Sequence, residues 1–263
     1  MSSYLDNVRI VLSHTTHPGN IGAAARAMKT MGLYNLYLVN PRHFPDAQAD
    51  TMSAGAEDVL RDAVVCASMD EALQGTVYVA AMTARLRDIS HPVLTPREAM
   101  PGLAQQAKQH PVALLFGTEM SGLTNEEMGK AHALLRIPAN PEYSSLNLAA
   151  AVQVACYELN VALQYAGTNL REIELEPARH EEMEGLFRHL EETLTQIGFF
   201  NTKFPNKLML KLRRLYARAR LEQEEVNILR GILSATTGYN TRPKSGSQAK
   251  SGNQESAPSK VSE

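Results

Sequence analysis

Cysteine, net charge and long apolar runs are all scarce in this chain of 263 residues, whose formal net charge is −2. The near balance of charge means that the molecule as a whole is no polycation. Cys66 and Cys156 stand in apolar surroundings without CxxC or Cys/His ligand spacing, which favours buried free thiols in a reducing compartment over a disulfide or a metal site. No apolar run could span a membrane and no signal sequence begins the chain, so we expect a cytoplasmic protein.

Two common nucleotide-binding patterns are also missing. No GxGxxG follows the first predicted strand, which argues against the usual dinucleotide-binding domain. Residues 117–124 (GTEMSGLT) have the strand-then-GxxxxG layout of a phosphate-binding loop, but Leu123 stands where that loop has its lysine. Without this cation an NTPase is a poor interpretation, and simple turn geometry explains Gly117 and Gly122 equally well.

Alternating strand and helix patterns fill the first 165 residues. The predicted strands are Val8–Leu12, Leu36–Val39, Ala63–Ala67, Val77–Ala81, Val112–Phe116 and Leu134–Ile137. The predicted helices among them are Ile21–Met31, Met69–Leu73 and Pro96–Lys108. This alternation predicts an α/β fold with a parallel sheet, in which the loops after the strands gather at one edge. Ligands of open α/β sheets bind at that edge.

A polar, turn-rich loop runs directly into an alanine-rich helix at residues 138–153 (PANPEYSSLNLAAAVQ). Ser144 or Ser145 is predicted to cap this helix, with Asn147 in its first turn. Such a helix terminus suits the polar or anionic part of a ligand, although an ordinary cap on a core helix explains either serine alone. The loop is distinguished by its density of polar side chains, which are Asn140, Glu142, Tyr143, Ser144, Ser145 and Asn147.

The composition changes after residue 166. Gly167–Asn169 end the long helix, and the acidic residues 171–177 indicate a linker. Three helices are predicted beyond it, Glu181–Ile197, Asn206–Arg220 and Glu222–Leu233, and Leu208, Leu212, Leu215 and Ala219 mark an apolar face on the second. The predicted divisions are an α/β domain at 1–166, a linker at 167–177, a helical extension at 178–240 and a disordered tail at 241–263.

Three segments together resemble a known family. They are 20–26 (NIGAAAR) with Gly32, 115–119 (LFGTE) with 122–124 (GLT), and 137–148 (IPANPEYSSLNL). In this order and spacing they resemble the three motifs of the SPOUT class of RNA methyltransferases. The third motif and the C-terminal extension are similar to the TrmJ-type tRNA 2′-O-methyltransferases of that class. The chain departs from the family pattern at Thr118 and Met120, where arginines are common.

The resemblance implies a trefoil-knotted, Rossmann-like sheet domain, in which the chain from about Gly117 to the helix after Ser145 passes through a loop. It also implies S-adenosylmethionine as cofactor, held in the knot by three loops. The residues that match the family's cofactor loops are Met82, Thr83, Ala84, Gly117, Ile137, Ser144, Ser145 and Leu146. Backbone groups of such loops can bind the adenine edge, while Met82, Ile137 and Leu146 supply apolar walls.

Arg26, in the first motif, is the predicted catalytic residue, with Ser145 as a second polar contact to the hydroxyl or the cofactor. Methyl transfer to a ribose 2′-hydroxyl needs in-line placement and removal of the hydroxyl proton. A guanidinium seldom gives up its proton, so we expect Arg26 to clamp a phosphate and to stabilise charge on the 2′-oxygen. Asn20, Glu119 and Asn147 are predicted to hold the loops, although capping or surface roles explain Asn20 and Glu119 equally well.

The expected partners are tRNA and a second copy of the chain. Arg85 and Arg87, beside the first cofactor loop, are candidate phosphate contacts. A basic stripe on the second helix of the extension, which could also be a solvated face, consists of Lys207, Lys211, Arg214 and Arg218. The resemblance implies a homodimer with shared active sites and methylation of cytidine or uridine at nucleotide 32 of the anticodon loop. Another RNA substrate, an RNA-binding protein without catalysis and a nucleotide-binding regulator remain alternatives.

Overall fold

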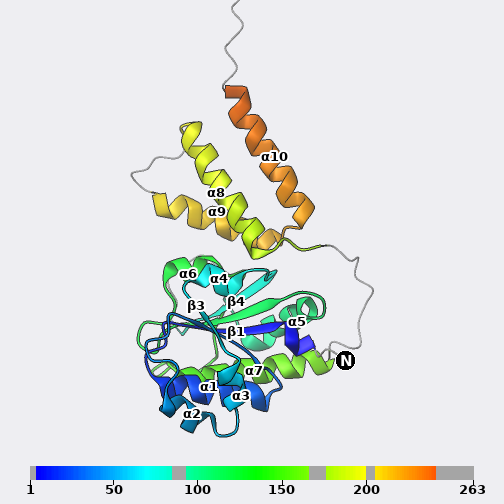
Figure 1. Cartoon of the computed structure of the whole chain (residues 1–263). Helices are drawn as coiled ribbons and strands as arrows, with labels where there is room; N and C mark the ends of the chain where they lie inside the picture. Colours follow the sequence, from blue (N-terminus) through cyan, green and yellow to red (C-terminus); the bar gives the residue numbers. More distant parts are fainter. Residues whose placement is uncertain (1–3, 85–92, 166–175, 200–204, 241–263) are drawn as a thin grey trace, which may run out of the picture.

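A seven-stranded sheet forms the centre of the computed structural model, which describes residues 4–84, 93–165, 176–199 and 205–240 (Figure 1). The strands are β1 (Val8–Ser13), β2 (Asn35–Val39), β3 (Val64–Cys66), β4 (Tyr78–Met82), β5 (Val93–Leu94), β6 (Val112–Phe116) and β7 (Ala133–Leu135). They run in the order β3-β2-β1-β6-β4-β7-β5, and every pair is parallel. The parallel sheet predicted from the sequence is therefore confirmed.

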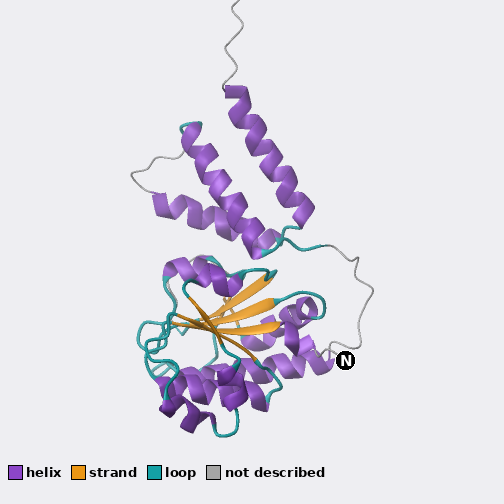
Figure 2. Ribbon diagram, viewed as in Figure 1, coloured by secondary structure: helices purple, strands orange, loops and turns teal. Residues whose placement is uncertain are grey.

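Helices cover both faces of this sheet (Figure 2). The helices of the sheet domain are a 3-10 turn η1 (Tyr4–Asn7), α1 (Pro18–Thr30), α2 (Ala47–Ser53), α3 (Glu57–Arg61), α4 (Met69–Leu73), α5 (Pro96–Ala107), α6 (Asn125–Gly129) and α7 (Leu148–Tyr165). Helices α1, α5 and α7 pack together on one face, whereas α4 and α6 contribute to the core of the other. No helix within the described ranges is both long and apolar enough to cross a membrane.

The two faces of the sheet bury different side chains because successive residues of a strand point in opposite directions. In β6, Leu114 and Phe116 belong to the larger core under α1, α5 and α7, while Ala113 and Leu115 face α4 and α6. Continuous burial of all five β6 residues is the pattern expected of a central parallel strand.

Helix α1 packs very closely against α2 through its small residues. A Cβ atom placed on Gly22 would lie 2.0 Å from the backbone oxygen of Ala49, so no side chain fits at this contact. Ala24 and Ala25 are also fully buried. The small residues of α1 therefore allow its backbone to approach α2 closely.

Beyond the sheet domain, three helices form the C-terminal extension: α8 (His180–Gln196), α9 (Pro205–Ala219) and α10 (Gln223–Asn240). They stand on the α4 and α6 side of the sheet (Figure 1). Their small core consists of Ala178, Met183, Leu186, Phe187 and Val226, with partly buried neighbours from α9 and α10. Helix α10 reaches seven residues beyond the predicted end at Leu233.

The packing face of α9 differs from the predicted one. Leu215 is about half exposed, whereas Met209 and Tyr216 pack against the extension core. Arg213 also faces inward, where its guanidinium lies 4.4 Å from the centre of the Phe187 ring. An aromatic face and a nearby carboxylate make a partly buried arginine favourable, which a count of apolar residues at helical spacing does not reveal.

Five short elements were not predicted, because elements of two to seven residues give little periodic signal: η1, α2, α3, α6 and β5. Both cysteines are buried free thiols, as predicted, and burial raises the pKa of Cys156 to about 12. Most of the predicted linker and the whole predicted disordered tail lie outside the described residues.

Candidate active site

Three neighbouring strands end at one cavity. β6, β4 and β7 are adjacent in the sheet, so the loops that follow them meet at its carboxyl edge. The cavity between these loops has a volume of about 190 Å³. The structure places all eight predicted cofactor-loop residues in its lining, namely Met82, Thr83, Ala84, Gly117, Ile137, Ser144, Ser145 and Leu146. Strand order explains this convergence, because residues far apart in sequence follow strands that pair directly.

The cavity wall combines apolar side chains with polar groups. Met82, Ile137 and Leu146 supply the apolar part, and Thr83 and Ser144 are polar residues of the same lining. Gly117 brings backbone to the wall, because a Cβ atom there would stand 2.1 Å from the backbone of the next turn of the same loop. Further lining residues, which were not among the predicted cofactor contacts, include Phe116, Thr118, Met120, Ser121, Leu148 and Ala151. Such a mixed wall suits a flat heterocycle with a polar tail.

Glu119 fastens the loop after β6 to the start of α1. Its Oε1 accepts hydrogen bonds from Asn20 Nδ2 (2.9 Å) and the His17 backbone N–H (3.2 Å). Its Oε2 accepts from the backbone N–H (3.1 Å) and the hydroxyl (2.9 Å) of Thr16. Asn147 Nδ2 donates in turn to Asn20 Oδ1 at 2.9 Å. The three residues predicted to hold the loops are therefore brought together in one network, joined by Thr16, which the sequence did not indicate.

This network sets the charge of Glu119. Partial burial alone raises the pKa of the carboxyl, but the hydrogen bonds from Asn20, from the Glu119 backbone and from Thr16 outweigh it and lower the pKa to about 2. The carboxylate is therefore ionised throughout the neutral range.

Replacing Glu119 by glutamine is expected to lower the free energy of unfolding by about 1 to 2 kcal/mol at neutral pH, because one amide oxygen replaces two acceptors and solvent screens this half-open site. The pKa of about 2 lies below its ordinary value of 4.5, so the carboxylate stabilises the fold above that value and this contribution is lost as the pH falls toward 2. Urea denaturation of both proteins at several pH values measures the difference. An undiminished difference near pH 2 contradicts the assignment, and the exposed Glu191→Gln variant is the control.

Helix α7 begins later than predicted. Its first residue is Leu148, and the side chain of Asn147 caps it by accepting from the N–H groups of Ala149 (2.9 Å) and Ala150 (3.4 Å). The prediction that Ser144 or Ser145 caps the helix is therefore wrong. An asparagine at this position satisfies two free N–H groups, which leaves both serines in the loop at the cavity wall.

Arg26 lies on α1, away from the cavity lining of its own chain. Its side chain is exposed and has no hydrogen bond or ion pair with the described part of the chain. Arg26 lies six residues after Asn20 in the same helix, and Asn20 belongs to the Glu119 network. The guanidinium is thus held on a rigid helix with its donors open to a ligand.

A second network of polar contacts joins Glu127, Ser13 and His14. The buried Glu127 carboxylate accepts a short hydrogen bond from the Ser13 hydroxyl and another from the Thr124 N–H at 2.6 Å. Ser13 Oγ lies 2.8 Å from His14 Nδ1, and His14 has a left-handed backbone with φ of 51°. His14 Nδ1 also lies 3.9 Å from Glu127 Oε1. Only long-range folding brings these residues together.

The predicted RNA-binding residues are placed less uniformly. Lys211 and Arg218 are exposed on α9, but Arg214 is half-buried and its Nε is buried without a hydrogen-bond partner among the described residues. The side chain of Lys207 lies outside the described residues, as do Arg85 and Arg87 altogether. The described part of the stripe therefore has two freely accessible cations.

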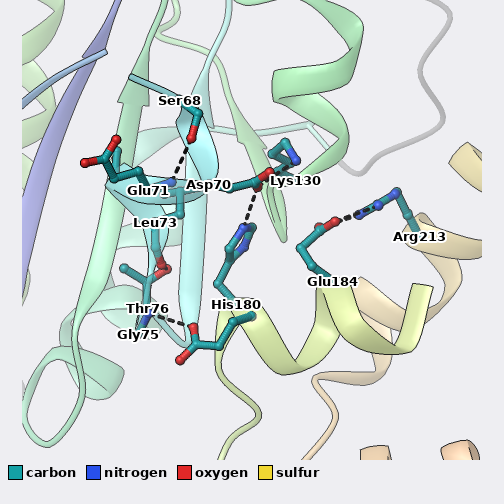
Figure 3. A network of polar contacts seen from close by, with 12 residues as sticks. Ser68, Asp70, Glu71, Leu73, Gly75, Thr76, Lys130, His180, Glu184 and Arg213 are labelled. Carbon is teal, nitrogen blue, oxygen red and sulfur yellow. Dashed lines mark hydrogen bonds and ion pairs between the residues drawn. The ribbon is translucent and has the colours of Figure 1, made fainter. Parts of the chain in front are cut away.

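The start of α8 docks on the sheet domain through a polar cluster (Figure 3). Asp70 Oδ1 lies 2.7 Å from Lys130 Nζ at the end of α6 and 2.9 Å from Nε2 of the buried His180. The His180 N–H also donates to the Thr76 backbone oxygen at 2.7 Å. Burial raises the pKa of Asp70, but the hydrogen bonds from Lys130 and His180 outweigh it and hold the pKa below its usual range. These contacts fix the extension against α4 and α6.

Asp70, His180 and Glu184 have potential ligand atoms within 4.8 Å of one another. Both carboxylates are already paired, Asp70 with Lys130 and Glu184 with two nitrogens of Arg213 at 2.5 and 2.8 Å. A metal ion would have to displace these cations, so the cluster is better explained as a docking contact.

The fold and the cavity agree with what comparison with known proteins finds. Residues 7–157 match the model of the SpoU rRNA Methylase family, and the chain belongs to that family. A structure of a SpoU methyltransferase from Streptomyces viridochromogenes, AviRb, shares the fold at a TM-score of 0.50 and 22% identity, with 61% of each chain covered.

Within the family the chain is similar to TrmJ proteins. Residues 181–249 match the C-terminal domain of the tRNA methyltransferase TrmJ. The tRNA (cytidine/uridine-2′-O-)-methyltransferase TrmJ of Sodalis glossinidius is 51% identical over 88% of this chain and 91% of its own length. The crystal structure of TrmJ from Z. mobilis ZM4 matches 86% of this chain and 97% of its own length at 35% identity and a TM-score of 0.76. The resemblance of the three motifs and the extension to TrmJ-type methyltransferases is confirmed.

Proposed function

We propose that the protein transfers a methyl group from S-adenosylmethionine to a ribose 2′-hydroxyl of tRNA, at cytidine or uridine 32 of the anticodon loop. The observation that carries this proposal is the convergence of the three motif loops on one cavity in a chain that is 51% identical to a named tRNA (cytidine/uridine-2′-O-)-methyltransferase. The assignment to nucleotide 32 rests on the resemblance of the motifs to TrmJ-type enzymes, and no described side chain identifies the nucleotide.

The residues present fit the proposed cofactor. Apolar walls at Met82, Ile137 and Leu146 match a purine, and backbone at Gly117 can approach it because no side chain intervenes. Ser144 and Ser145 add hydroxyl-bearing residues to the lining, which suit the polar part of the molecule. When bound, S-adenosylmethionine supplies an electrophilic methyl on a sulfonium. The chain's own part is to orient the 2′-hydroxyl in line with it and to exclude water.

Arg26 serves a site shared between two chains in this proposal. It stands outside the cavity lining of its own chain, and its exposed guanidinium is free to reach the cavity of a second copy. There its forked donors hold the phosphate beside the ribose and stabilise negative charge that develops on the 2′-oxygen, with Ser145 as a second polar contact. A homodimer with a two-fold axis repeats this site twice. We further propose that the chain from about Gly117 to the helix after Ser145 passes through a loop to form a trefoil knot, and that the enzyme works in the cytoplasm.

Transfer of labelled methyl from S-adenosylmethionine to an unmodified tRNA transcript tests the proposal, with nuclease digestion to locate the product. Methyl on a ribose of the anticodon loop supports enzyme, substrate and position together. Transfer to ribosomal RNA but not to tRNA favours the alternative substrate. Cofactor binding without transfer to any RNA favours a binding protein on the same fold.

Alanine at both Lys211 and Arg218 is expected to weaken tRNA binding and to flatten its salt dependence. Each lost phosphate contact lowers the slope of log K against log salt by about 0.7 to 0.9, so the double variant should lose roughly 1.5. Both side chains are exposed on α9, a helix whose Met209 and Tyr216 pack against the small core of the extension. Filter binding between low and physiological salt measures the slope, with the exposed Arg61→Ala as the charge control. An unchanged slope indicates that the basic stripe is a solvated face and does not contact phosphates.

A further inference from the structure

Two large hydrophobic side chains stand out by their exposure. Met120 is 87% exposed and Tyr143 is 81% exposed, and no other large hydrophobic side chain among the described residues exceeds the 67% of Phe199. Both lie on loops of the same cavity. Met120 lines it, and Tyr143 directly precedes the lining residues Ser144 and Ser145. Apolar groups gathered at the mouth of a cavity indicate a surface that a ligand covers.

Both side chains are carried on ordered turns. On the Met120 turn, the Gly122 N–H donates to the Thr118 backbone oxygen at 3.0 Å. On the Tyr143 turn, the Tyr143 N–H donates to the backbone oxygen of Asn140 at 3.0 Å, and the Glu142 N–H donates to Asn140 Oδ1 at the same distance. Their exposure is therefore built into the loops, and a ligand that binds them orders little additional chain.

We propose that Tyr143, assisted by Met120, holds the unpaired nucleobase of the nucleotide that accepts the methyl group. This inference rests on the proposed function. A ribose whose 2′-hydroxyl reaches the cavity must have its own base within one nucleotide of the cavity mouth, where these two side chains stand. A base inside a helical stack cannot approach so closely, and splayed bases of single-stranded RNA are held by stacking on aromatic rings. The polarisable thioether of Met120 suits the remaining exposed face of such a base.

Stacking also explains tolerance for two pyrimidines. Cytidine and uridine differ at the 4-position, where one has an amino group and the other a carbonyl, so a hydrogen bond to that position would distinguish them. A π-face contact does not, because every base offers one. The proposed contact therefore selects for an unstacked base while accepting both pyrimidines.

The test compares Tyr143→Ala, Tyr143→Phe and Tyr34→Ala in methyl transfer to a tRNA transcript and in direct binding of that transcript. Tyr34 is an exposed tyrosine just before β2, at the opposite edge of the sheet, and serves as the matched control. We expect Tyr143→Ala to raise KM for tRNA about 10- to 100-fold, in line with the loss of one stacked base. Tyr143→Phe should stay near wild type, because its ring still stacks. Calorimetric affinity for S-adenosylmethionine should be unchanged in all three variants, which shows that the cavity is intact.

Three results overturn the inference. The first is a wild-type KM in Tyr143→Ala, and the second is an equal loss in Tyr143→Phe, which assigns the effect to the hydroxyl. The third is dissociation of Tyr143→Ala dimers in sedimentation, which assigns the surface to a second copy of the chain. If the wild-type protein transfers no methyl group to any RNA, the proposed function is contradicted instead. Direct binding of the transcript then tests the stacking contact separately. If that contact exists, Tyr143→Ala must still weaken binding of the transcript.

Discussion

Alanine at position 26 is expected to reduce methyl transfer to tRNA by about 100- to 1,000-fold, the cost of removing one donor aimed at a developing oxyanion. The affinity for S-adenosylmethionine should not change, because Arg26 lies outside the cavity lining of its own chain and has no described partner whose loss could disturb the fold. Arg26→Lys should recover little of the rate, since a lysine keeps the charge but not the two-pronged geometry. Single-turnover rates at saturating cofactor and tRNA separate this loss from a loss of binding.

Arg61→Ala is the matched control for Arg26→Ala. Its guanidinium is exposed and pairs with the neighbouring Asp62, so the substitution removes the same charge at a residue outside the cavity lining. A rate within twofold of wild type for Arg26→Ala contradicts the assigned role. Equal losses in both variants indicate a general effect of charge on RNA binding.

Mixing experiments test whether Arg26 acts across the proposed dimer. Arg26→Ala lacks the arginine but has an intact cavity, whereas Leu146→Arg keeps the arginine and fills its own cavity. If each site combines one chain's cavity with the other chain's arginine, random mixing restores about a quarter of the sites, because half of the dimers are mixed and each has one complete site. If cavity and arginine of the same chain act together, mixing restores none.

The sequence was sufficient for the parts of the site that follow strands. A buried strand ending in a polar or glycine-bearing loop is a local pattern, so the ends of β4, β6 and β7 were predictable within a few residues. Their adjacency in the sheet was not, because β4 pairs with β6 and β7 across 30 or more residues of chain and no local pattern encodes that pairing. That the eight cavity residues lie together was predicted from the resemblance to a family. The physical cause of their proximity, the strand order, is seen only in the structure.

The contacts of charged residues were the least predictable part. Glu119 was equally well explained as a surface group, yet it accepts four hydrogen bonds from residues about 100 positions earlier. Arg213 was counted with neither the apolar face nor the basic stripe of α9, although it pairs with Glu184 and lies over Phe187. In both cases a partner distant in sequence decides whether the side chain is buried, and periodicity within one helix or loop contains no information about that partner.

Alanine at Gly117 is expected to abolish S-adenosylmethionine binding at accessible concentrations and to lower the free energy of unfolding by about 3 kcal/mol or more. The added methyl would stand 2.1 Å from the backbone carbon of Gly122 and the backbone nitrogen of Leu123. Neither is a flexible side chain, so the loop itself must move. That loop lines the cavity and contains Glu119, whose hydrogen bonds fasten it to α1.

Gly122→Ala separates this steric effect from the ordinary cost of losing a glycine in the same loop. Gly122 has a φ of 69°, and a Cβ atom there meets nothing within 4 Å, so its replacement strains only the backbone, by about 1 kcal/mol. Calorimetric cofactor affinity and thermal unfolding should therefore show a folded, binding-competent Gly122→Ala and a Gly117→Ala that has lost binding. If Gly117→Ala binds S-adenosylmethionine like wild type, the loop tolerates displacement and its backbone does not form the cofactor contact. If Gly122→Ala loses binding equally, the turn conformation, and not the close approach at Gly117, shapes the cavity.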